Sequence, residues 1–374
     1  MTVKEPHVAI LASFSGQGGV ERMVLNLVRE FARRGLRVDL LPIRAEGAHF
    51  RDLPDGVTVI DLGVRHAATS ITGLAGYLRR VRPPALLAAK DRAGRAAVWA
   101  RRLAGVDTRI VIRLGTTLSA ALEDRGWLAR RARYWPMRLA YPGANRIVAV
   151  SQGVADDTRS ITGLPAERIV VVRNPVITPE LPELAAAEVD HPWFHSHEVP
   201  VLLGVGRLTR QKDFPTLVRA FARVRGTRPC RLIVLGEGRD RPALEALAGE
   251  LGVAEDLDLP GFTGNPYAWM ARAGCFVLSS RWEGSPNVLT EAMALGTPVV
   301  ATDCPSGPRE VLRGGEVAPL VAMGDDAALA EAIGRVLDAP PRPETLQNAV
   351  AEYTVERSAD GYLAALGLQS APDV

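Results

Sequence analysis

Short apolar runs rich in β-branched residues alternate with longer segments of helical period along most of this chain. Successive strands in such a pattern are joined by crossover helices, so the pattern predicts a parallel β-sheet with helices on both faces. The predicted strands lie at residues 7–12, 37–41, 57–61, 85–89, 109–112, 146–150, 169–172, 201–205, 231–235, 257–259, 275–279 and 298–301. The predicted fold class is therefore α/β.

The chain is long enough for two domains, each with its own core. It has 374 residues, and its 47% hydrophobic and 23% charged residues exclude a disordered or fibrous protein. A stretch at residues 174–200 contains five prolines and no repeated apolar period, which indicates a boundary. We expect two Rossmann-like domains facing across a cleft: residues 1–180, a linker at 181–199, residues 200–352, and a C-terminal helix at 353–374 that returns to the first domain.

The cellular context follows from what the sequence lacks. Its three cysteines (Cys230, Cys275 and Cys304) are too few for a disulfide framework, and their apolar surroundings suit reduced thiols. No apolar run approaches the roughly 18 to 20 residues of a membrane span, and the first residues lack the pattern of a signal peptide. The sequence thus predicts a cytoplasmic protein with no structural zinc.

A glycine-rich loop follows the first predicted strand. The segment at residues 15–21 contains Gly16, Gly18 and Gly19, and it opens the first helix. A dinucleotide fingerprint would need a third glycine where Glu21 stands, although Asp39 lies at about the distance of a ribose-binding acid. A phosphate or substrate loop is the favoured interpretation, with a packing turn and a dehydrogenase loop as the alternatives.

A basic loop follows the first strand of the second half. Arg207 and Lys212 flank it, and Lys212 is one of only three lysines among 45 basic residues. Arginine offers a planar fork to phosphate oxygens and lysine a compact charge, so the pair suits a diphosphate. A solvated basic loop is the alternative. Glu237, in the glycine turn after the next strand, is a candidate for base or ribose contacts.

The segment at residues 280–293 carries two carboxylates, Glu283 on a loop and Glu291 just inside a helix. The free N–H groups of a helix start attract an anion, and carboxylates accept hydrogen bonds from sugar hydroxyls. A sugar nucleotide would satisfy both. The alternative is that Glu283 is a solvated charge and that Glu291 merely benefits from the helix dipole.

These segments together resemble the retaining, nucleotide-sugar-dependent glycosyltransferases of the GT-B fold known as glycosyltransferase group 1. The resemblance is carried by residues 18–22 (GGVER), 150–154 (VSQGV), 173–176 (RNPV), 205–213 (VGRLTRQKD), 235–238 (LGEG) and 303–312 (DCPSGPREVL), with Glu283 and Glu291. They span most of the chain in the expected order.

The resemblance implies a role for each candidate residue. Arg207 and Lys212 would hold the donor diphosphate, Glu283 the transferred sugar, and Glu291 the ribose hydroxyls. Backbone amides of Asn287, Val288 and Leu289 would add phosphate contacts, and the loop of Gly18 and Gly19 would face the donor phosphates and the acceptor. The implied reaction needs no metal or other cofactor.

One position departs from the family. Many relatives have a histidine after the fourth or fifth strand, where this sequence has Arg113 followed by Leu114 and Gly115. We expect Arg113 to act on the acceptor side, or the leaving phosphate to take the acceptor proton.

The implied activity is the transfer of a hexose or N-acetylhexosamine, from UDP as the expected carrier, to a glycan or lipid-linked glycan in cell-surface polysaccharide or glycoconjugate synthesis. A nucleotide-sugar epimerase of the same fold and a non-catalytic sugar-nucleotide-binding partner are the alternatives.

A basic stretch with interleaved aromatic residues lies in the first half. Residues 79–146 contain 16 basic and 4 acidic residues, with Trp99, Trp127, Tyr134, Trp135 and Tyr141 among them. This combination suits the surface of an anionic membrane, so we expect a peripheral protein at the inner face of the cytoplasmic membrane. No nucleic-acid-binding motif is present, and the alternative is a solvated arginine-rich face.

Overall fold

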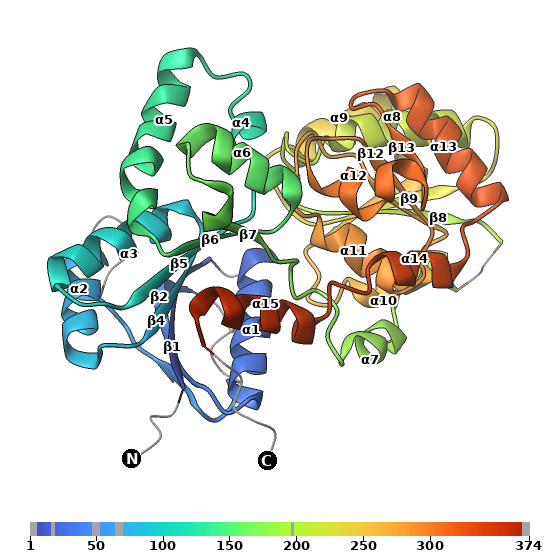
Figure 1. Cartoon of the computed structure of the whole chain (residues 1–374). Helices are drawn as coiled ribbons and strands as arrows, with labels where there is room; N and C mark the ends of the chain where they lie inside the picture. Colours follow the sequence, from blue (N-terminus) through green and yellow to red (C-terminus); the bar gives the residue numbers. More distant parts are fainter. Residues whose placement is uncertain (1–5, 16–18, 47–52, 64–69, 196–197, 369–374) are drawn as a thin grey trace. The chain divides into compact units, whose positions relative to one another are not determined.

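The chain forms two compact units, each built on a parallel sheet with helices on both faces (Figure 1). The computed structural model describes residues 6–15, 19–46, 53–63, 70–195 and 198–368. One unit comprises Met1–Val176 with Tyr353–Val374, and the other comprises Ile177–Glu352. The chain therefore passes from the first unit to the second and back again.

The first unit contains a seven-stranded sheet in the order β3-β2-β1-β4-β5-β6-β7. All of its strand pairs are parallel. The strands are β1 (His7–Ser15), β2 (Arg37–Glu46), β3 (Val57–Val59), β4 (Ala85–Ala89), β5 (Arg109–Leu114), β6 (Arg146–Ala149) and β7 (Ile169–Val171). The order reverses direction between β1 and β4.

Two layers of helices cover this sheet. Its helices are α1 (Gly19–Arg33), α2 (Ser70–Val81), α3 (Asp91–Ala104), α4 (Leu118–Ala121), α5 (Trp127–Ala140), α6 (Gln152–Thr162) and α15 (Val355–Leu366). Buried residues of α2, α3, α5 and α6 pack on one face, and those of α1 and α15 pack on the other. Central strand β4 is buried along its whole length because its alternate side chains enter both cores.

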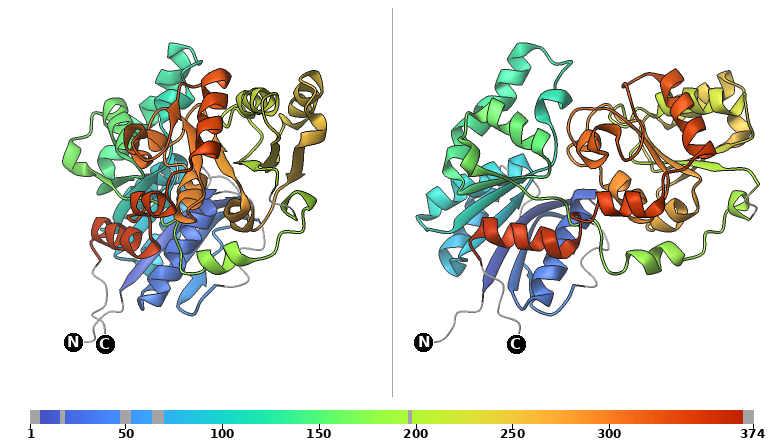
Figure 2. Two further views of the ribbon diagram at one scale, coloured as in Figure 1. Left: turned by 90° about the vertical axis from the view of Figure 1, so that its right-hand side faces the viewer. Right: turned by 45° about the vertical axis from the view of Figure 1, so that its right-hand side comes forward.

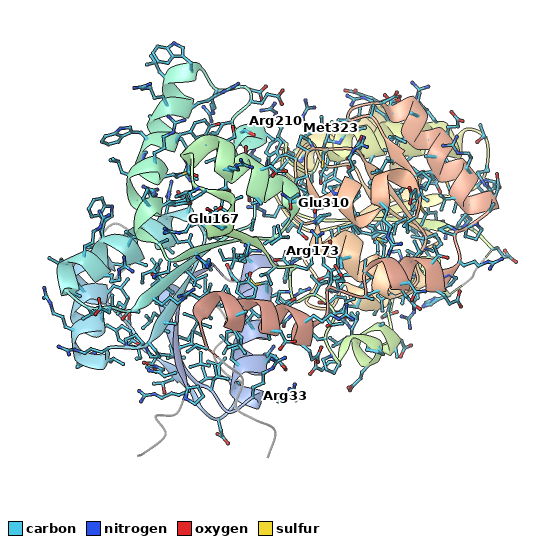
Figure 3. All side chains as sticks on the ribbon, viewed as in Figure 1. Arg33, Glu167, Arg173, Arg210, Glu310 and Met323 are labelled. Atoms are coloured by element: carbon cyan, nitrogen blue, oxygen red, sulfur yellow. The ribbon has the colours of Figure 1, made fainter. Side chains whose placement is uncertain are left out.

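Helix α15 reaches the first unit from the far end of the sequence and packs on α1 and on the sheet (Figure 2). Arg34 donates to the Glu356 carbonyl at 2.9 Å, and Arg109 donates to the Ala365 carbonyl at 2.9 Å. Where the chain re-enters the unit, the guanidinium of Arg173 lies 5.6 Å from the ring centre of Tyr353 (Arg173 is labelled in Figure 3).

The second unit contains a six-stranded parallel sheet in the order β10-β9-β8-β11-β12-β13. Its strands are β8 (Val201–Val205), β9 (Arg231–Leu235), β10 (Leu257–Gly261), β11 (Cys275–Leu278), β12 (Val299–Thr302) and β13 (Leu320–Val321). Its helices are α7 (Leu181–Ala186), α8 (Phe214–Arg225), α9 (Arg241–Glu250), α10 (Tyr267–Arg272), α11 (Asn287–Ala294), α12 (Gly307–Val311), α13 (Asp326–Asp338) and α14 (Pro343–Ala349). The order reverses between β8 and β11.

The segment expected to be a linker at 181–199 belongs to the second unit instead. It forms α7, which packs on α10, and a 3₁₀ turn at Pro192–Phe194. The ring of His191 lies 2.9 Å from the Asp258 carboxylate through Nε2 and packs edge-on against Trp193. The α7–α10 packing and the His191–Asp258 contact join residues far apart in sequence, which a local apolar period cannot indicate.

Every predicted strand is present, and the structure adds short strand β13. Helices α8, α9 and α12 have a proline in the first turn, where its missing N–H costs no hydrogen bond, and Pro286 is the N-cap residue of α11. Within the described ranges, no helix has both the length and the apolar character required to cross a bilayer.

Candidate functional site

The candidate site of the second unit lies where its strand order reverses. In open parallel sheets, ligands bind at the carboxyl ends of the two strands that flank this reversal, because the loops leaving them diverge. These strands are β8 and β11. The loop after β8 carries Arg207 and Lys212, and the loop after β11 carries Glu283. Topology thus brings together three residues that are up to 76 positions apart (207 to 283) in sequence.

Lys212 and Glu283 form an ion pair. The Nζ atom of Lys212 lies 2.7 Å from Oε1 of Glu283, and their side chains are 16% and 9% exposed. Gly206 makes room for the lysine stem, because a Cβ atom at this position would lie 2.8 Å from Cε of Lys212. Arg207, on the same loop, is exposed. The site therefore presents one paired and one solvent-facing cation.

A hydrogen-bond framework fixes the two loops. Ser280 donates to Oε1 of Glu283 at 2.8 Å, and Ser279 donates to the Lys212 carbonyl at 2.7 Å. Thr302, at the end of β12, donates to the Ser280 carbonyl at 2.6 Å. Each partner of the ion pair is thus tied to the adjacent strand ends, which limits its motion.

The turn into α8 stores backbone strain beside the ion pair. Asp213 has φ 47°, a left-handed conformation that is uncommon for a residue with a Cβ atom. Thr216 donates to its carboxylate at 2.9 Å, and Arg281 from the opposite loop lies 3.6 Å from it. Strained residues persist where surrounding contacts hold them, and they cluster at binding sites.

The glycine turn after β9 packs directly on the basic loop. Gly236 has φ 133°, and a Cβ atom there would lie 2.0 Å from the Gly206 carbonyl oxygen. A Cβ atom on Gly238 would lie 2.1 Å from the Leu208 carbonyl oxygen. Between them, Glu237 is paired with Arg241 at 2.7 Å, and hydrogen bonding from Arg241 lowers the pKa of Glu237. These glycines are required by the close approach of two backbones.

Helix α11 begins beside the ion pair and holds the second glutamate. Glu291 is 3% exposed, and the Tyr267 hydroxyl donates to its Oε1 at 3.4 Å. Asn287 and Val288 occupy the first two helical positions, whose N–H groups point out of the helix start. The Leu289 amide, by contrast, donates to the Pro286 carbonyl at 3.0 Å. The Leu289 N–H is thus already bonded in this structure, and its expected phosphate contact stays a prediction.

Cys304 lies close to this site in the segment that precedes α12. It is 1% exposed. Burial raises the pKa of its thiol, and the Glu283 carboxylate raises it further. Cys304 therefore stays protonated and packs as a small apolar side chain rather than acting as a nucleophile.

In the first unit, the glycine loop is only partly described. Gly18 lies outside the described residues, and Gly19 is the exposed first residue of α1. Asp39 is fully buried and accepts a hydrogen bond from the Tyr77 hydroxyl at 2.6 Å. It cannot serve as a ribose-binding acid of a dinucleotide site, so the carboxylate that the dehydrogenase alternative requires is not accessible to a ligand.

Arg113 is enclosed in the first unit. It is 3% exposed, and its Nη2 atom donates to Oδ1 of Asn174 at 2.8 Å. Burial raises the pKa of Tyr362 on α15, and the nearby positive charge of Arg113 offsets part of this rise. In this structure the guanidinium connects β5 to the segment of Asn174 and does not face solvent, and its expected role on the acceptor side stays a prediction.

Several residues of the site were not identified from the sequence. Ser280, Thr302 and Tyr267 position the predicted residues, and the partners of Thr302 and Tyr267 come from more distant parts of the chain. Only Ser280 has a local signal, since it stands three residues before Glu283. Among the described residues, no group of three or more His, Cys, Asp or Glu side chains is arranged to hold a metal ion.

The two Rossmann-like units, with loops bearing cations and carboxylates at the strand ends, define a protein of the GT-B class. The family described as glycosyl transferases group 1 matches residues 199–339, and a glycosyl transferase 4-like domain matches residues 18–175. The lipopolysaccharide core biosynthesis glycosyltransferase LpsE of Rhizobium meliloti is 30% identical over 338 residues, covering 87% of each chain. The chain therefore belongs to the group 1 glycosyltransferases.

Two further similarities are informative. A Campylobacter jejuni N-acetylgalactosaminyltransferase, whose name specifies a diphospho-undecaprenol-linked acceptor, is 30% identical over 63% of this chain and 62% of its own length. The structure of Anabaena HepE in complex with UDP and glucose has a TM-score of 0.77 at 18% identity, covering 97% of this chain and 100% of that one. The second similarity confirms the predicted fold.

Proposed function

We propose that the protein is a retaining glycosyltransferase that moves a hexose or N-acetylhexosamine from a UDP-sugar to a glycan or lipid-linked glycan. The observation that carries this proposal is the Lys212–Glu283 ion pair at the strand reversal of the second unit, beside the start of α11. The cation and the helix start suit the diphosphate of a sugar nucleotide, and the carboxylate suits the hydroxyls of its sugar.

Donor binding would redistribute the ion pair. The diphosphate would compete with Glu283 for Lys212. It would also bind exposed Arg207 and the amides of Asn287 and Val288. Glu283 would then accept hydrogen bonds from the hydroxyls of the sugar. Glu291, held by Tyr267, would receive the ribose hydroxyls.

The chemical step would follow from this placement. The bond between the anomeric carbon and the diphosphate oxygen breaks, and the acceptor oxygen bonds to the same face of that carbon. The leaving diphosphate accepts the proton of the acceptor hydroxyl, since no general base is assigned. Its developing charge is stabilised by Arg207 and Lys212, as preorganised cations stabilise a transition state more than a ground state.

The proposed reaction needs no metal, because two cations and a helix start are available to neutralise the diphosphate. We expect full activity in EDTA. A loss of activity on chelation that Mn²⁺ or Mg²⁺ restores would contradict this part of the proposal.

The acceptor class is supported by the names of relatives, which specify lipopolysaccharide core synthesis and a diphospho-undecaprenol acceptor. Incubation with UDP-sugars, with and without an extract of acceptor lipids, is the test. Transfer with retention at the anomeric carbon, read by NMR of the product, would support the proposal. Isomerised free donor would indicate the epimerase alternative, and binding without either product would indicate a non-catalytic partner.

A further inference from the structure

An unusual set of exposed apolar side chains lies on two neighbouring helices of the first unit. They are Trp99 (42% exposed) and Leu103 (50%) on α3, and Trp127 (70%), Leu128 (65%), Trp135 (58%) and Leu139 (45%) on α5. We call these six residues the α3–α5 surface. Exposed apolar residues grouped in this way mark an interaction site, because they contribute little to the stability of the fold itself.

Helix α5 turns its apolar side outward. Only Met137 and Ala140 of its 14 residues are buried. With 3.6 residues per turn, the four α5 residues of the surface fall within an arc of about 120°, on the side opposite these two. The apolar side of α5 therefore faces solvent, whereas the apolar side of a helix that simply covers a core faces inward.

A buried cluster holds α5 in this orientation. The Asp91 carboxylate, at the start of α3, accepts hydrogen bonds from Arg133 of α5 at 2.7 Å and from Tyr141 at 3.0 Å. Arg95 of α3 completes the cluster with two bonds of 3.0 Å. Because polar bonds fix the inner side of α5, its outer tryptophans stay in solvent.

The surroundings of the α3–α5 surface are strongly cationic. Helices α3 and α5 contain eight arginines and a single acidic residue, Asp91, which the buried cluster uses. Arg131 and Arg138 fall within the same arc of α5 as the tryptophans, and the Arg102 guanidinium lies 4.8 Å from the ring centre of Trp99. Arginine and tryptophan side by side are typical of protein surfaces that meet lipid headgroups.

We propose that the α3–α5 surface docks the protein on an anionic lipid bilayer, with Trp127 and Trp135 entering the headgroup region and the arginines binding lipid phosphates. A second copy of the chain fits less well, because a symmetric contact would place the same arginines against each other. The proposal concerns docking alone, and it does not depend on which sugar or acceptor the enzyme uses.

The test uses vesicles that contain neither donor nor acceptor. Full-length protein is sedimented with vesicles of phosphatidylcholine alone or with about 30% phosphatidylglycerol, at low salt (about 0.1 M) and high salt (about 0.5 M). The variant Trp127→Ser/Trp135→Ser removes the two most exposed indoles. Leu251→Ser/Met323→Ser is the matched control, because these side chains are 40% and 44% exposed on the second unit (Met323 is labelled in Figure 3).

We expect binding to the anionic vesicles only, at least about ten-fold weaker at high salt as screening shortens the reach of the charges. The affinity of the tryptophan variant for anionic vesicles should be lower by about ten-fold or more. The control variant should bind like the wild type, and both variants should have the melting temperature of the wild type. Transfer to a short-chain, water-soluble acceptor should be unchanged in the tryptophan variant, which separates docking from catalysis. Equal binding of wild type and tryptophan variant, equal binding to neutral and anionic vesicles, or no binding to either would overturn the proposal.

Discussion

The Nζ atom of Lys212 lies 2.7 Å from Oε1 of Glu283, so two charges that we assign to different parts of one donor are paired with each other. An ion pair with side chains 16% and 9% exposed is costly to break unless another charge replaces the lost partner. A diphosphate can replace Glu283 as the partner of Lys212. The state of this pair is therefore coupled to donor binding.

Lys212→Ala should lower turnover more than donor affinity. The charge on the leaving diphosphate grows in the transition state, so the lost cation matters most there. A loss of about ten- to a hundred-fold in kcat is expected for one charge-assisted contact. Arg210→Ala is the control, because Arg210 belongs to the same loop but lies over the Trp282 ring at 5.9 Å. Equal losses in the two variants would mean that only the net charge of the loop matters.

Glu283→Gln should weaken the contacts with the transferred sugar and leave those with the nucleotide unchanged. The amide cannot accept the same hydrogen bonds from sugar hydroxyls, so the loss in kcat/KM should differ among UDP-sugars. Affinity for free UDP should not fall, because Lys212 no longer has a competing carboxylate. Calorimetry with UDP and initial rates with each donor are the measurements. A weaker affinity for free UDP would show that Glu283 contacts the nucleotide.

Glu291→Gln should act mainly on binding. Ribose contacts are alike before and during the reaction, so KM should rise while kcat stays close to its normal value. The expected loss of UDP affinity is about ten-fold or more. Glu245→Gln is a suitable control, since this glutamate of the same unit is 56% exposed and pairs only with Arg241 at 3.3 Å. A Glu291 variant with normal UDP affinity would show that the ribose binds elsewhere.

Gly238→Ala should disturb the basic loop, although residue 238 is not part of that loop but packs against it. The added Cβ atom would lie 2.1 Å from the Leu208 carbonyl oxygen, so one backbone must shift. Overpacking of this kind costs about 1 to 3 kcal/mol, and UDP affinity should fall with it. Gly249→Ala is the control, because nothing lies within 4 Å of a Cβ atom at that helical position. Thermal melting and UDP titration of both variants would show whether the added Cβ atom at position 238 lowers stability and UDP affinity.

Glu30 should make the stability of the protein depend on pH. Burial alone would raise the pKa of Glu30, but hydrogen bonds from Arg33 and Arg34 outweigh burial and lower it (Arg33 is labelled in Figure 3). A carboxyl with a lowered pKa stabilises the fold above its unfolded pKa and loses this contribution as the pH falls through the folded value. Glu30→Gln should therefore lower the free energy of unfolding by about 1 kcal/mol at pH 7, and by less below pH about 4.

Denaturant titrations at both pH values measure this difference. Glu331→Gln is the matched control, because its partner Arg335 lies 2.8 Å away on an exposed helix face, with side chains 62% and 72% exposed. It should change stability by less than about 0.5 kcal/mol. A pH-independent effect of Glu30→Gln would show that packing, not charge, is responsible.

The sequence was sufficient to predict the α/β class and all twelve candidate strands because buried parallel strands such as β4 have continuous apolar sequences. It also identified Lys212 and Glu283 through their motifs. It could not show that the two are paired, since the pairing depends on the strand order around β8 and β11. The roles of Thr302 and Tyr267 were missed for the same reason.

Two other features of the structure could not be predicted from the sequence, for physical reasons. Proline content at 174–200 indicates a lack of regular structure, not a lack of packing, so α7 and the His191 cluster were taken for a linker. Arg113 was assigned to the acceptor side because it stands where many relatives have a histidine. Its burial against Asn174 and Tyr362 depends on α15, more than 240 residues further along the chain (113 to 355).

The return of α15 to the first unit has a consequence for biosynthesis. During translation the sheet face that this helix covers, with Val111, Val148 and Val172, must wait until all of the second unit has left the ribosome. The nascent first unit therefore emerges with an open apolar face for some 180 residues of synthesis, about ten to forty seconds at elongation rates of about 5 to 20 residues per second. It is during this interval, before the last helix closes the core, that the chain has most need of a chaperone.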